Sequence, residues 1–251
     1  MNGDRPQNFT RLEPFRDLFA SGAPVLTYHK FGSRPRGVRL KGLYLATRLL
    51  EAQLGELRAA GFASRGIGDV IASPAGSAIG LSIDDGFQSV FDEALPVIRR
   101  HGMTATLYLV ADRLGGWNDW EQSLGEVAAP LMTREGVREW LDAGQRIGAH
   151  TLTHPWLTQL PRPSAREEIT ASRARLEDWF QVPVVDFCYP YGDWNDAVRG
   201  IVREAGYATA VTTDFGVNTV DTDRWALRRI TARHRSRNLR SLVAWWRRWR
   251  A

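Results

Sequence analysis

The sequence predicts an α/β fold, a distorted (β/α)7-type barrel in a single domain. Apolar, β-branched segments alternate with amphipathic helical segments along most of the chain, and this alternation is typical of a parallel sheet covered by helices. Several predicted strands end in Asp, His or Tyr residues, and barrel enzymes carry their chemistry at these ends. The predicted strands number closer to seven than to eight, so we expect the barrel to be incomplete or distorted.

Each predicted strand is a short apolar run, rich in β-branched or aromatic residues and bounded by Gly, Pro or polar residues. In chain order the predicted barrel strands span 23–29, 80–83, 104–110, 146–150, 184–192, 208–213 and 226–230, and a further short strand is predicted at 64–67. The strand at 184–192 runs into a Pro-Tyr-Gly turn, which ends its regular hydrogen bonding.

Each predicted helix repeats its apolar residues at intervals of three and four, and most of them end at a glycine. In chain order the predicted helices span 9–19, 47–60, 90–101, 133–143, 164–180 and 196–205. The helix at 164–180 begins with Ser164 as N-cap and has Glu167 three residues later, the pattern of a capping box. The segment 115–130 is the least regular part of the middle of the chain.

Size and composition limit the class of protein. The 251 residues, 43% of them apolar, can form one core of barrel size. No run approaches the roughly 18 apolar residues of a membrane span, and the first 20 residues contain no apolar stretch of the signal-peptide kind. We therefore expect a cytoplasmic protein. The single cysteine, Cys188, excludes an internal disulfide and a thiolate metal site.

Three parts of the chain differ in character: an N-terminal helical extension (1–22), the barrel (23–235) and a basic, Trp- and Arg-rich C-terminal helix (236–251). Ten arginines and no acid lie between 224 and 251, so residues 1–223 carry a net charge of −5 although the whole chain carries +5. Apolar and basic residues fall on opposite sides of the last helix, at Leu239, Leu242, Val243, Trp246 and Trp249 and at Arg240, Arg247 and Arg248 respectively.

Two interpretations of this C-terminal helix stay open. Its apolar side can dock on the barrel, or the helix can lie peripherally on an anionic membrane surface, here the inner face of the membrane. No nucleic-acid-binding module accompanies the basic charge, so we expect no nucleic acid partner. The sequence does not indicate an oligomeric state.

The segment 80–87 ends a predicted strand in two adjacent carboxylates, Asp84 and Asp85, followed by Gly86. Adjacent side chains of an extended chain point to opposite sides, so one carboxylate can serve a metal and the other a proton. An acidic turn without chemistry is the alternative for this segment alone.

Two imidazoles, His150 and His154, follow the strand at 146–150. Neutral imidazole is the commonest nitrogen ligand of zinc-like ions, although a His-x-x-x-His pair alone is more often a solvated or capped pair. Together with a carboxylate at an earlier strand end, the pair forms an Asp-plus-two-His set that leaves one position for water. This combination favours a divalent metal site, with Zn²⁺ as the expected ion.

The two motifs resemble those of the polysaccharide deacetylases, carbohydrate esterase family four. The family's Thr-Phe-Asp-Asp-Gly motif is matched by 82–86, and its His-Ser/Thr-x-x-His motif by 150–154. The resemblance extends from about Val25 to Ile230. It implies that Asp84 is the catalytic base and that Asp85, His150 and His154 hold the metal.

The chain departs from the family at the third motif, Arg-Pro-Pro-Tyr-Gly. Cys188 stands where the arginine that orients the base would be, so another group has to hold Asp84. The backbone N–H of Tyr191 remains a candidate donor to the oxyanion. The family's fourth motif is not recognisable at 212–218.

The general acid is also unusual. No histidine occupies the last predicted strand, where the common branch of the family has one. The Tyr28-His29 pair on the first strand resembles the branch that includes deacetylases of poly-N-acetylglucosamine, which implies His29 as general acid. His234 is the alternative, although it lies in a basic run typical of a solvated tail.

Aromatic residues near the predicted strand ends are candidates to contact a sugar ring. They are Trp117, Trp120, Trp156 and Tyr189. Trp117 and Trp120 can equally cap the barrel. The function that these features predict is metal-dependent removal of an N-acetyl group from an N-acetylated sugar in a polysaccharide, an oligosaccharide or a lipid-linked sugar. An amidase of the same superfamily acting on a small non-sugar amide and a non-catalytic carbohydrate-binding protein are the alternatives.

Overall fold

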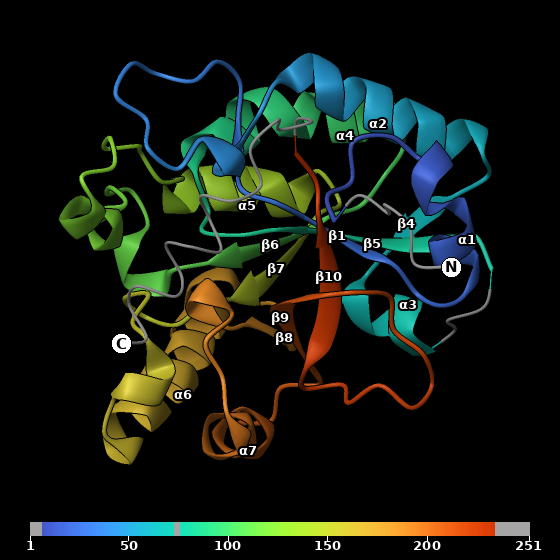
Figure 1. The fold of residues 1–251 in the computed structure, drawn as a ribbon. Coiled ribbons are helices and arrows are strands. Elements are labelled where there is room, and N and C mark those ends of the chain that lie inside the picture. The colour runs from blue at the N-terminus through green and yellow to red at the C-terminus, as the bar shows by residue number, and fades with distance from the viewer. Residues whose placement is uncertain (1–6, 73–75, 234–251) are drawn as a thin grey trace.

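The structure, a computed structural model, describes residues 7–72 and 76–233 of the chain. The predicted C-terminal helix and His234 lie outside the described residues. Among the described residues, seven parallel strands close into a barrel, which confirms the predicted fold class (Figure 1). In barrel order these strands are β1 (Val25–Tyr28), β5 (Ala78–Ile83), β6 (Thr106–Leu109), β7 (Arg146–Ala149), β8 (Asp186–Cys188), β9 (Thr209–Phe215) and β10 (Leu227–Thr231).

Strand β1 closes the ring because it pairs on both of its edges. Leu26 is in register with Leu81 of β5 on one side and with Ile230 of β10 on the other. An eighth strand, β4 (Ala63–Arg65), pairs with the first half of β5, outside the closed ring. The short strands β2 (Lys30–Phe31) and β3 (Tyr44–Leu45) form a separate parallel pair that follows β1.

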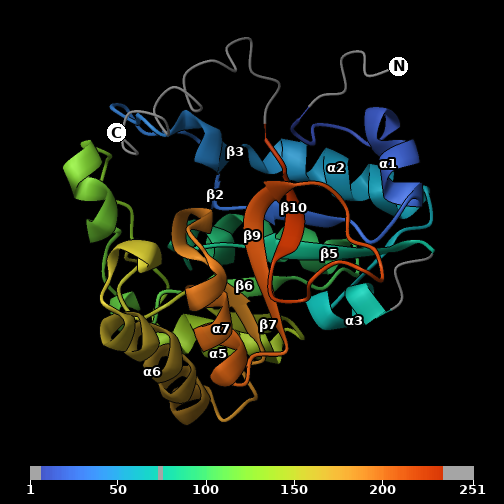
Figure 2. The same ribbon diagram turned by 60° about the horizontal axis from the view of Figure 1, so that its bottom comes forward.

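The helices lie around the outside of the strands (Figures 1 and 2). The α-helices are α1 (Arg16–Ala20), α2 (Thr47–Ala59), α3 (Ile67–Ala72), α4 (Leu95–Arg100), α5 (Arg134–Asp142), α6 (Arg162–Phe180) and α7 (Asp196–Glu204). Short turns of 3-10 helix are η1 (Glu13–Phe15), η2 (Lys41–Leu43), η4 (Ala111–Arg113), η5 (Asp119–Leu124), η6 (Leu157–Gln159) and η7 (Pro190–Gly192). In the described part of the chain, no helix has the length and apolar character needed to span a bilayer.

Four helical segments differ from the prediction. The helix expected at 9–19 is helical only from Glu13, as η1 and α1, because Phe9 instead pairs with Ala232 after β10. The helix expected at 90–101 begins as a π-helical turn, η3 (Val90–Ala94), and becomes α-helical only in α4. Helix α6 begins at Arg162 rather than after an N-cap at Ser164, because Pro163 fits the first turn of a helix, where its missing N–H leaves no bond unmade. Helix α3 was not predicted, since six residues are too few to show a helical period.

The N-terminal segment packs against the same hydrophobic core as the barrel. Phe9, Phe15 and Phe19 are buried and pack against one another with ring centroids 5.5–5.8 Å apart. The backbone of Phe9 donates to the carbonyl of Thr231 and accepts from the N–H of Arg233, which holds the end of β10 in place. The division of the chain at residues 22 and 235 stays a prediction.

Candidate active site

The carboxyl ends of the barrel strands surround one cavity of about 460 Å³. Parallel strands of a barrel all end at the same face, so residues far apart in the sequence meet there. The cavity is lined by His29, Leu40, Gly42, Leu43, Asp84, Asp85, Trp120, Glu121, Leu124, His150, His154, Tyr189, Tyr191, Gly192, Thr213, Thr231 and Arg233. The structure therefore brings all three predicted metal ligands and all three predicted catalytic residues into one site.

The predicted metal ligands converge on a single point. The Nε2 atoms of His150 and His154 lie 3.3 and 3.4 Å from the same oxygen, Oδ1 of Asp85. Zinc ligands lie about 2.0–2.2 Å from the ion in a tetrahedral arrangement, which requires ligand atoms to be about 3.4 Å apart. These separations are longer than the 2.7–2.9 Å or so of an ordinary charge-assisted hydrogen bond. The three side chains therefore fit one divalent ion.

The protein fixes the orientation of each imidazole. The Nδ1 atom of His150 donates to the carbonyl oxygen of Cys188 at 2.7 Å, which fixes the ring and turns Nε2 toward Asp85. Burial acts to lower the pKa of His150, but Cys188 and Asp85 outweigh it and raise that pKa above its ordinary value. A metal bound by Nε2 would therefore displace a proton from this imidazole. His154 lies against the indole of Trp120, with centroids 4.8 Å apart and planes at 23°, and against the edge of Tyr191 at 4.4 Å. Its Nδ1 atom is buried without a hydrogen-bond partner among the described residues.

The charges of this set suit a metal site. Burial lowers the pKa of His154, which favours the neutral imidazole that a metal binds. Burial acts to raise the pKa of Asp85, but the neighbouring imidazoles of His150 and His154 outweigh it and hold that pKa well below its ordinary value. Asp85 is therefore an ionised carboxylate between two imidazoles.

Helix α6 anchors the loop that carries the histidines. The carboxylate of Glu168 accepts hydrogen bonds from the backbone N–H groups of Leu152 and Thr153 at 2.8 and 3.0 Å, and from the Thr153 hydroxyl at 2.6 Å. Within the loop, the backbone N–H of His154 donates to the hydroxyl of Thr151 at 3.0 Å. These bonds leave the loop little freedom to move the two imidazoles apart.

Backbone strain is concentrated in this site. Among the described residues, five that are not glycine have a positive φ, namely Asp85, Thr151, His154, Gln181 and Tyr191. Four of them belong to the site, while Gln181 ends helix α6. A left-handed backbone is unfavourable for residues other than glycine and persists where the surrounding structure enforces it, which is common at functional sites.

Arg229 on β10 holds the predicted base, and the sequence did not reveal this residue. Its guanidinium donates two bonds to Asp84, to Oδ1 at 2.7 Å and to Oδ2 at 2.8 Å. It also donates to the carbonyl of Thr212 at 2.7 Å and to the hydroxyl of Ser82 at 3.1 Å, which fix its own position. Burial acts to raise the pKa of Asp84, but Arg229 and His29 together keep it below its ordinary value.

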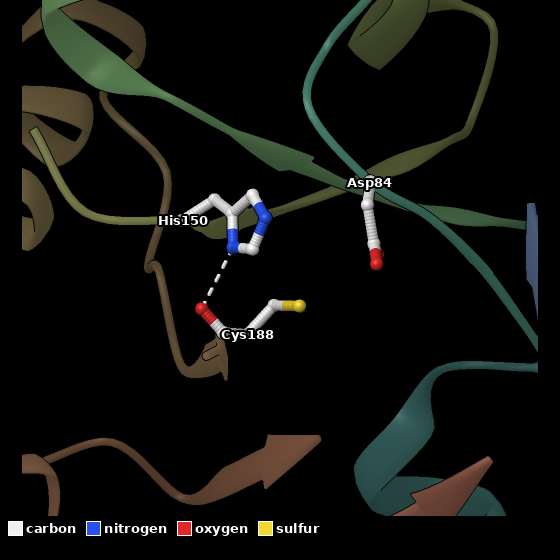
Figure 3. A group of neighbouring side chains, drawn as sticks. All are labelled: Asp84, His150 and Cys188. Atoms are coloured by element: carbon white, nitrogen blue, oxygen red, sulfur yellow. Dashed lines mark hydrogen bonds between the residues drawn. The ribbon is translucent and has the colours of Figure 1, made fainter. Parts of the chain in front are cut away.

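Cys188 occupies the space beside this ion pair. Its thiol lies 3.4 Å from the guanidinium of Arg229, and Figure 3 shows Cys188, Asp84 and His150 facing one another. His150 directs Nδ1 to the carbonyl of residue 188 and Nε2 to Asp85, so it has no nitrogen left for a second ion. Burial raises the pKa of the Cys188 thiol, which keeps it neutral. We interpret Cys188 as a small residue that leaves room for Arg229.

His29 lies on the other side of the base. Its Nε2 atom is 3.6 Å from Oδ2 of Asp84, and its side chain is 19% exposed and lines the cavity. Burial lowers the pKa of His29, while the negative charges of Asp84 and Asp85 oppose this effect. Of the two predicted general acids, the structure places His29 beside the base, whereas His234 lies outside the described residues.

The structure separates the four predicted substrate-binding aromatics. Trp120 and Tyr189 line the cavity. Trp156 does not line it but stacks on Tyr191 with centroids 4.1 Å apart and planes at 7°, so it supports the cavity wall from behind. Trp117 is 55% exposed and lines a separate hollow with Arg113 and Asp119. The two tryptophans of the 115–130 segment thus face different spaces.

A buried ion pair that the sequence did not reveal fixes the loop of Trp120. Lys30, 1% exposed, donates to Oε2 of Glu121 at 2.7 Å, and Asn118 donates to the same oxygen. The ammonium also lies 4.4 Å from the ring centroid of Phe87, which follows the Asp-Asp-Gly turn. Burial raises the pKa of Glu121 and Lys30 opposes this effect. The pair joins the strand after His29 to the wall of the cavity.

Comparisons with known proteins agree with this geometry. A family model described as polysaccharide deacetylase matches residues 72–210. The polysaccharide deacetylase homologue YxkH of Bacillus subtilis is 25% identical over 157 residues, which cover 62% of this chain and 52% of YxkH. Chitin deacetylase 1 of Cryptococcus neoformans is 27% identical over 161 residues, 62% of this chain and 31% of that protein. The chain thus spans about half the length of YxkH and a third of the chitin deacetylase.

Solved structures share the fold, and two of them illustrate the likeness. The Streptococcus pyogenes deacetylase PplD in complex with acetate has a TM-score of 0.72 at 21% identity, over 84% of this chain and 92% of that one. IcaB from Ammonifex degensii has a TM-score of 0.71 at 23% identity, over 84% and 91% of the two chains. Both of these solved chains therefore share the fold of this chain over about nine tenths of their length.

Proposed function

The chain belongs to the polysaccharide deacetylase family, and from this premise we propose that it is a metal-dependent hydrolase that removes the N-acetyl group from an N-acetylated sugar. The observation that carries the proposal is the pair of adjacent aspartates at the end of β5. One carboxylate oxygen of Asp85 lies close to the imidazoles of both His150 and His154. Asp84 accepts two hydrogen bonds from Arg229 and lines the same cavity. One carboxylate is thus available for a metal and the other for a proton.

Asp85, His150 and His154 would hold the ion, and we propose Zn²⁺ because one carboxylate and two imidazoles suit it and leave a position open. An ion bound there acts as a Lewis acid and lowers the pKa of water to about 7. The Asp85 carboxylate and the two oriented imidazoles are the chain's contribution to this step.

Asp84 serves as the general base in the proposed mechanism. Its low pKa keeps it ionised near neutral pH, and Arg229 aims it into the cavity. It removes a proton from the attacking water, and His29, 3.6 Å away, receives this proton and delivers it to the leaving nitrogen. This relay lets His29 act as the acid although burial lowers its pKa, because it need not be protonated before the reaction begins.

The amide oxygen of the substrate gains negative charge during the attack. The proposed donor from the chain is the backbone N–H of Tyr191, whose left-handed conformation (φ 59°) follows β8 at the edge of the cavity. The indole of Trp120 supplies an aromatic wall for the sugar ring, and Tyr189 closes the cavity beside it.

The position of Arg229 argues against the alternative of a non-catalytic carbohydrate-binding protein. That alternative rested on the absence of the third-motif arginine, which would have left Asp84 without a partner. The bidentate pair between Arg229 and Asp84 supplies the missing contact from another strand, so the departure at Cys188 gives no support to a decayed site.

We also propose that the segment 239–250 contacts an anionic membrane surface peripherally. The support is its sequence alone, in which tryptophan and leucine lie opposite arginine on a helical projection. Such contact would suit a lipid-linked sugar as substrate.

The proposal is tested by the release of acetate from N-acetylated chito-oligosaccharides and by elemental analysis. We expect Asp84→Asn to lower turnover by about 10²- to 10⁴-fold while the metal stays bound, and Asp85→Asn to lose the metal as well. Asp221→Asn, an exposed residue outside the site, is the control. Full activity of Asp84→Asn would remove the base assignment. A purified protein that retains no stoichiometric metal and releases no acetate would refute the function.

A further inference from the structure

The inner face of β10 continues beyond the catalytic centre. Side chains alternate along an extended chain, so Arg229, Thr231 and Arg233 point to the same side. Arg229 reaches the base, whereas Thr231 and Arg233 line the cavity. Four residues of extended chain span about 13 Å. Arg233, two residues after the end of β10, therefore leaves the backbone farther along the wall than Arg229 does, and its side chain lines the same cavity.

Arg233 differs from the buried cations Arg229 and Lys30 because it has no carboxylate partner among residues 7–72 and 76–233. Arg229 pairs with Asp84, and Lys30 pairs with Glu121. Arg233 is half-buried, its Nε atom is buried without a hydrogen-bond partner, and it forms no ion pair with any carboxylate of the described residues. Burying part of a charge without a partner is unfavourable, and here burial lowers the pKa of the guanidinium.

The acids of the cavity cannot satisfy Arg233 because each has another partner. Among the described residues that line the cavity, the carboxylates are Asp84, Asp85 and Glu121, and Arg233 is the only arginine or lysine. Asp84 pairs with Arg229, and Glu121 pairs with Lys30. Asp85 contacts the two imidazoles. No carboxylate that the structure describes in this cavity is left for Arg233, and a molecule that enters the cavity can supply the negative charge.

We propose that Arg233 is the centre of an anion subsite that binds a phosphate group attached to the N-acetylated sugar. Guanidinium pairs with phosphate through two parallel hydrogen bonds. Thr231 and Thr213 line the same cavity. Their hydroxyls would be additional donors, which favour phosphate, with its three or more acceptor oxygens, over a carboxylate with two. The backbone of Arg233 is held by its bond to Phe9, which keeps the side chain at the cavity. This inference rests on the proposed deacetylation, because it names the class of substrate that the same site accepts.

The test compares N-acetylglucosamine 1-phosphate with the neutral methyl glycoside of N-acetylglucosamine. We expect wild-type kcat/KM to favour the phosphate and Arg233→Met to lower the ratio of the two values about ten- to hundredfold, the range of hydrogen bonds to charged groups. Arg228→Met, an exposed arginine on the outer face of the same strand, should leave the ratio unchanged. Added salt should reduce the wild-type preference, because screening weakens a partly exposed ion pair. An equal ratio in all three proteins would overturn the subsite.

A binding measurement separates this inference from the proposed function. Calorimetric titration with N-acetylglucosamine 1-phosphate in the presence of EDTA, which prevents turnover, should show a Kd about ten- to hundredfold weaker in Arg233→Met than in Arg228→Met. Binding that depends on Arg233 in a protein that releases no acetate would support the subsite and refute the deacetylation. If the wild type releases acetate but Arg233→Met and Arg228→Met bind the phosphate compound with the same Kd, the deacetylation is supported and the subsite is refuted.

The source of the phosphate is distinguished by a second pair of compounds. A nucleoside diphosphate sugar and a polyprenyl diphosphate sugar present the same group next to the N-acetylated ring. Leu40, Leu43 and Leu124 line the cavity together with Arg233, so a polyprenyl compound would gain apolar contact. In both cases Arg233→Met has to lower kcat/KM more than Arg228→Met does, and failure with both compounds would overturn the inference.

Discussion

Replacement of Arg229 by cysteine tests whether this arginine positions the base. The substitution removes both hydrogen bonds to Asp84 and leaves that carboxylate, 3% exposed, without its counter-ion. Breaking a buried pair by removing one partner costs about 3–5 kcal/mol, a substantial part of the 5–15 kcal/mol or so that stabilises a typical domain. General base catalysis contributes about 10²- to 10⁴-fold, so we expect Arg229→Cys to lower kcat/KM by a factor in this range.

The pH dependence follows from the pKa of Asp84. Burial acts to raise this pKa, and Arg229 is the largest influence that lowers it. Without Arg229 the pKa rises, the base stays protonated up to a higher pH, and the acid limb of the kcat/KM profile moves upward. A depressed folded-state pKa stabilises the protein above the unfolded-state pKa, and this contribution is lost as the pH falls through the folded-state value. The stability difference from wild type should therefore shrink on acidification.

A variant in which residues 188 and 229 are exchanged shows whether a loss of activity in Arg229→Cys comes from the lost contact with Asp84 or from general damage to the fold. Arg229→Cys combined with Cys188→Arg preserves the composition and returns the guanidinium to the strand where the family motif has it. The thiol of Cys188 lies 3.4 Å from the guanidinium, so the new side chain enters the space that Arg229 leaves. We expect the exchange to recover much of the lost kcat/KM and to bring the acid limb back toward the wild-type pH.

The assay is acetate release across a pH series, with urea unfolding of the same samples. Arg228→Cys, on the exposed face of the same strand, controls for the loss of one positive charge. If Arg229→Cys is folded and keeps both the wild-type kcat/KM and the wild-type acid limb, Arg229 does not position the base and our interpretation of Cys188 is wrong.

Three further changes test the surroundings of the site. Glu121→Gln should destabilise the protein by about 3–5 kcal/mol in urea unfolding, because it leaves Lys30 charged and buried. The double variant Lys30→Met/Glu121→Leu should recover most of this loss. If Glu121→Gln has the stability of the wild type, the ion pair is not needed. Removal of the metal by EDTA should abolish acetate release and stoichiometric Zn²⁺ should restore it, whereas full activity after chelation would contradict metal dependence. Deletion of 239–251 should reduce co-sedimentation with anionic vesicles without lowering acetate release, and equal partitioning would argue that the segment does not contact membranes.

The predicted metal set could be found from the sequence because each of its two motifs is local. Asp85 directly follows Asp84, and His150 and His154 are four residues apart, so each motif names its residues before the fold is known. The barrel then only has to bring two strand ends together, and parallel strands of a barrel all end at one face. The alternation of strands and helices predicted that barrel.

Arg229 could not be found in the same way. It lies 145 residues from Asp84, and the last predicted strand contains two adjacent arginines, Arg228 and Arg229. Only the register of β10 in the closed barrel decides which of them points inward, and a shift of one residue would exchange them. The sequence also could not show which of Trp117 and Trp120 lines the cavity. A turn of 3-10 helix in their loop directs the two side chains to different hollows.

The geometry around Asp84 explains why a cysteine can replace the motif arginine without loss of the site. Strands β8 and β10 lie on either side of β9, and a side chain from each reaches the same buried space beside the carboxylate. The carboxylate has two oxygens, and one guanidinium already occupies both. A second arginine would add a positive charge and a long side chain to a space that one guanidinium fills, so a small residue at 188 accompanies an arginine at 229. If the arginine that holds Asp84 has moved from position 188 to position 229, exchanging the two residues should restore activity. If the site has instead lost its function, the exchange should restore nothing.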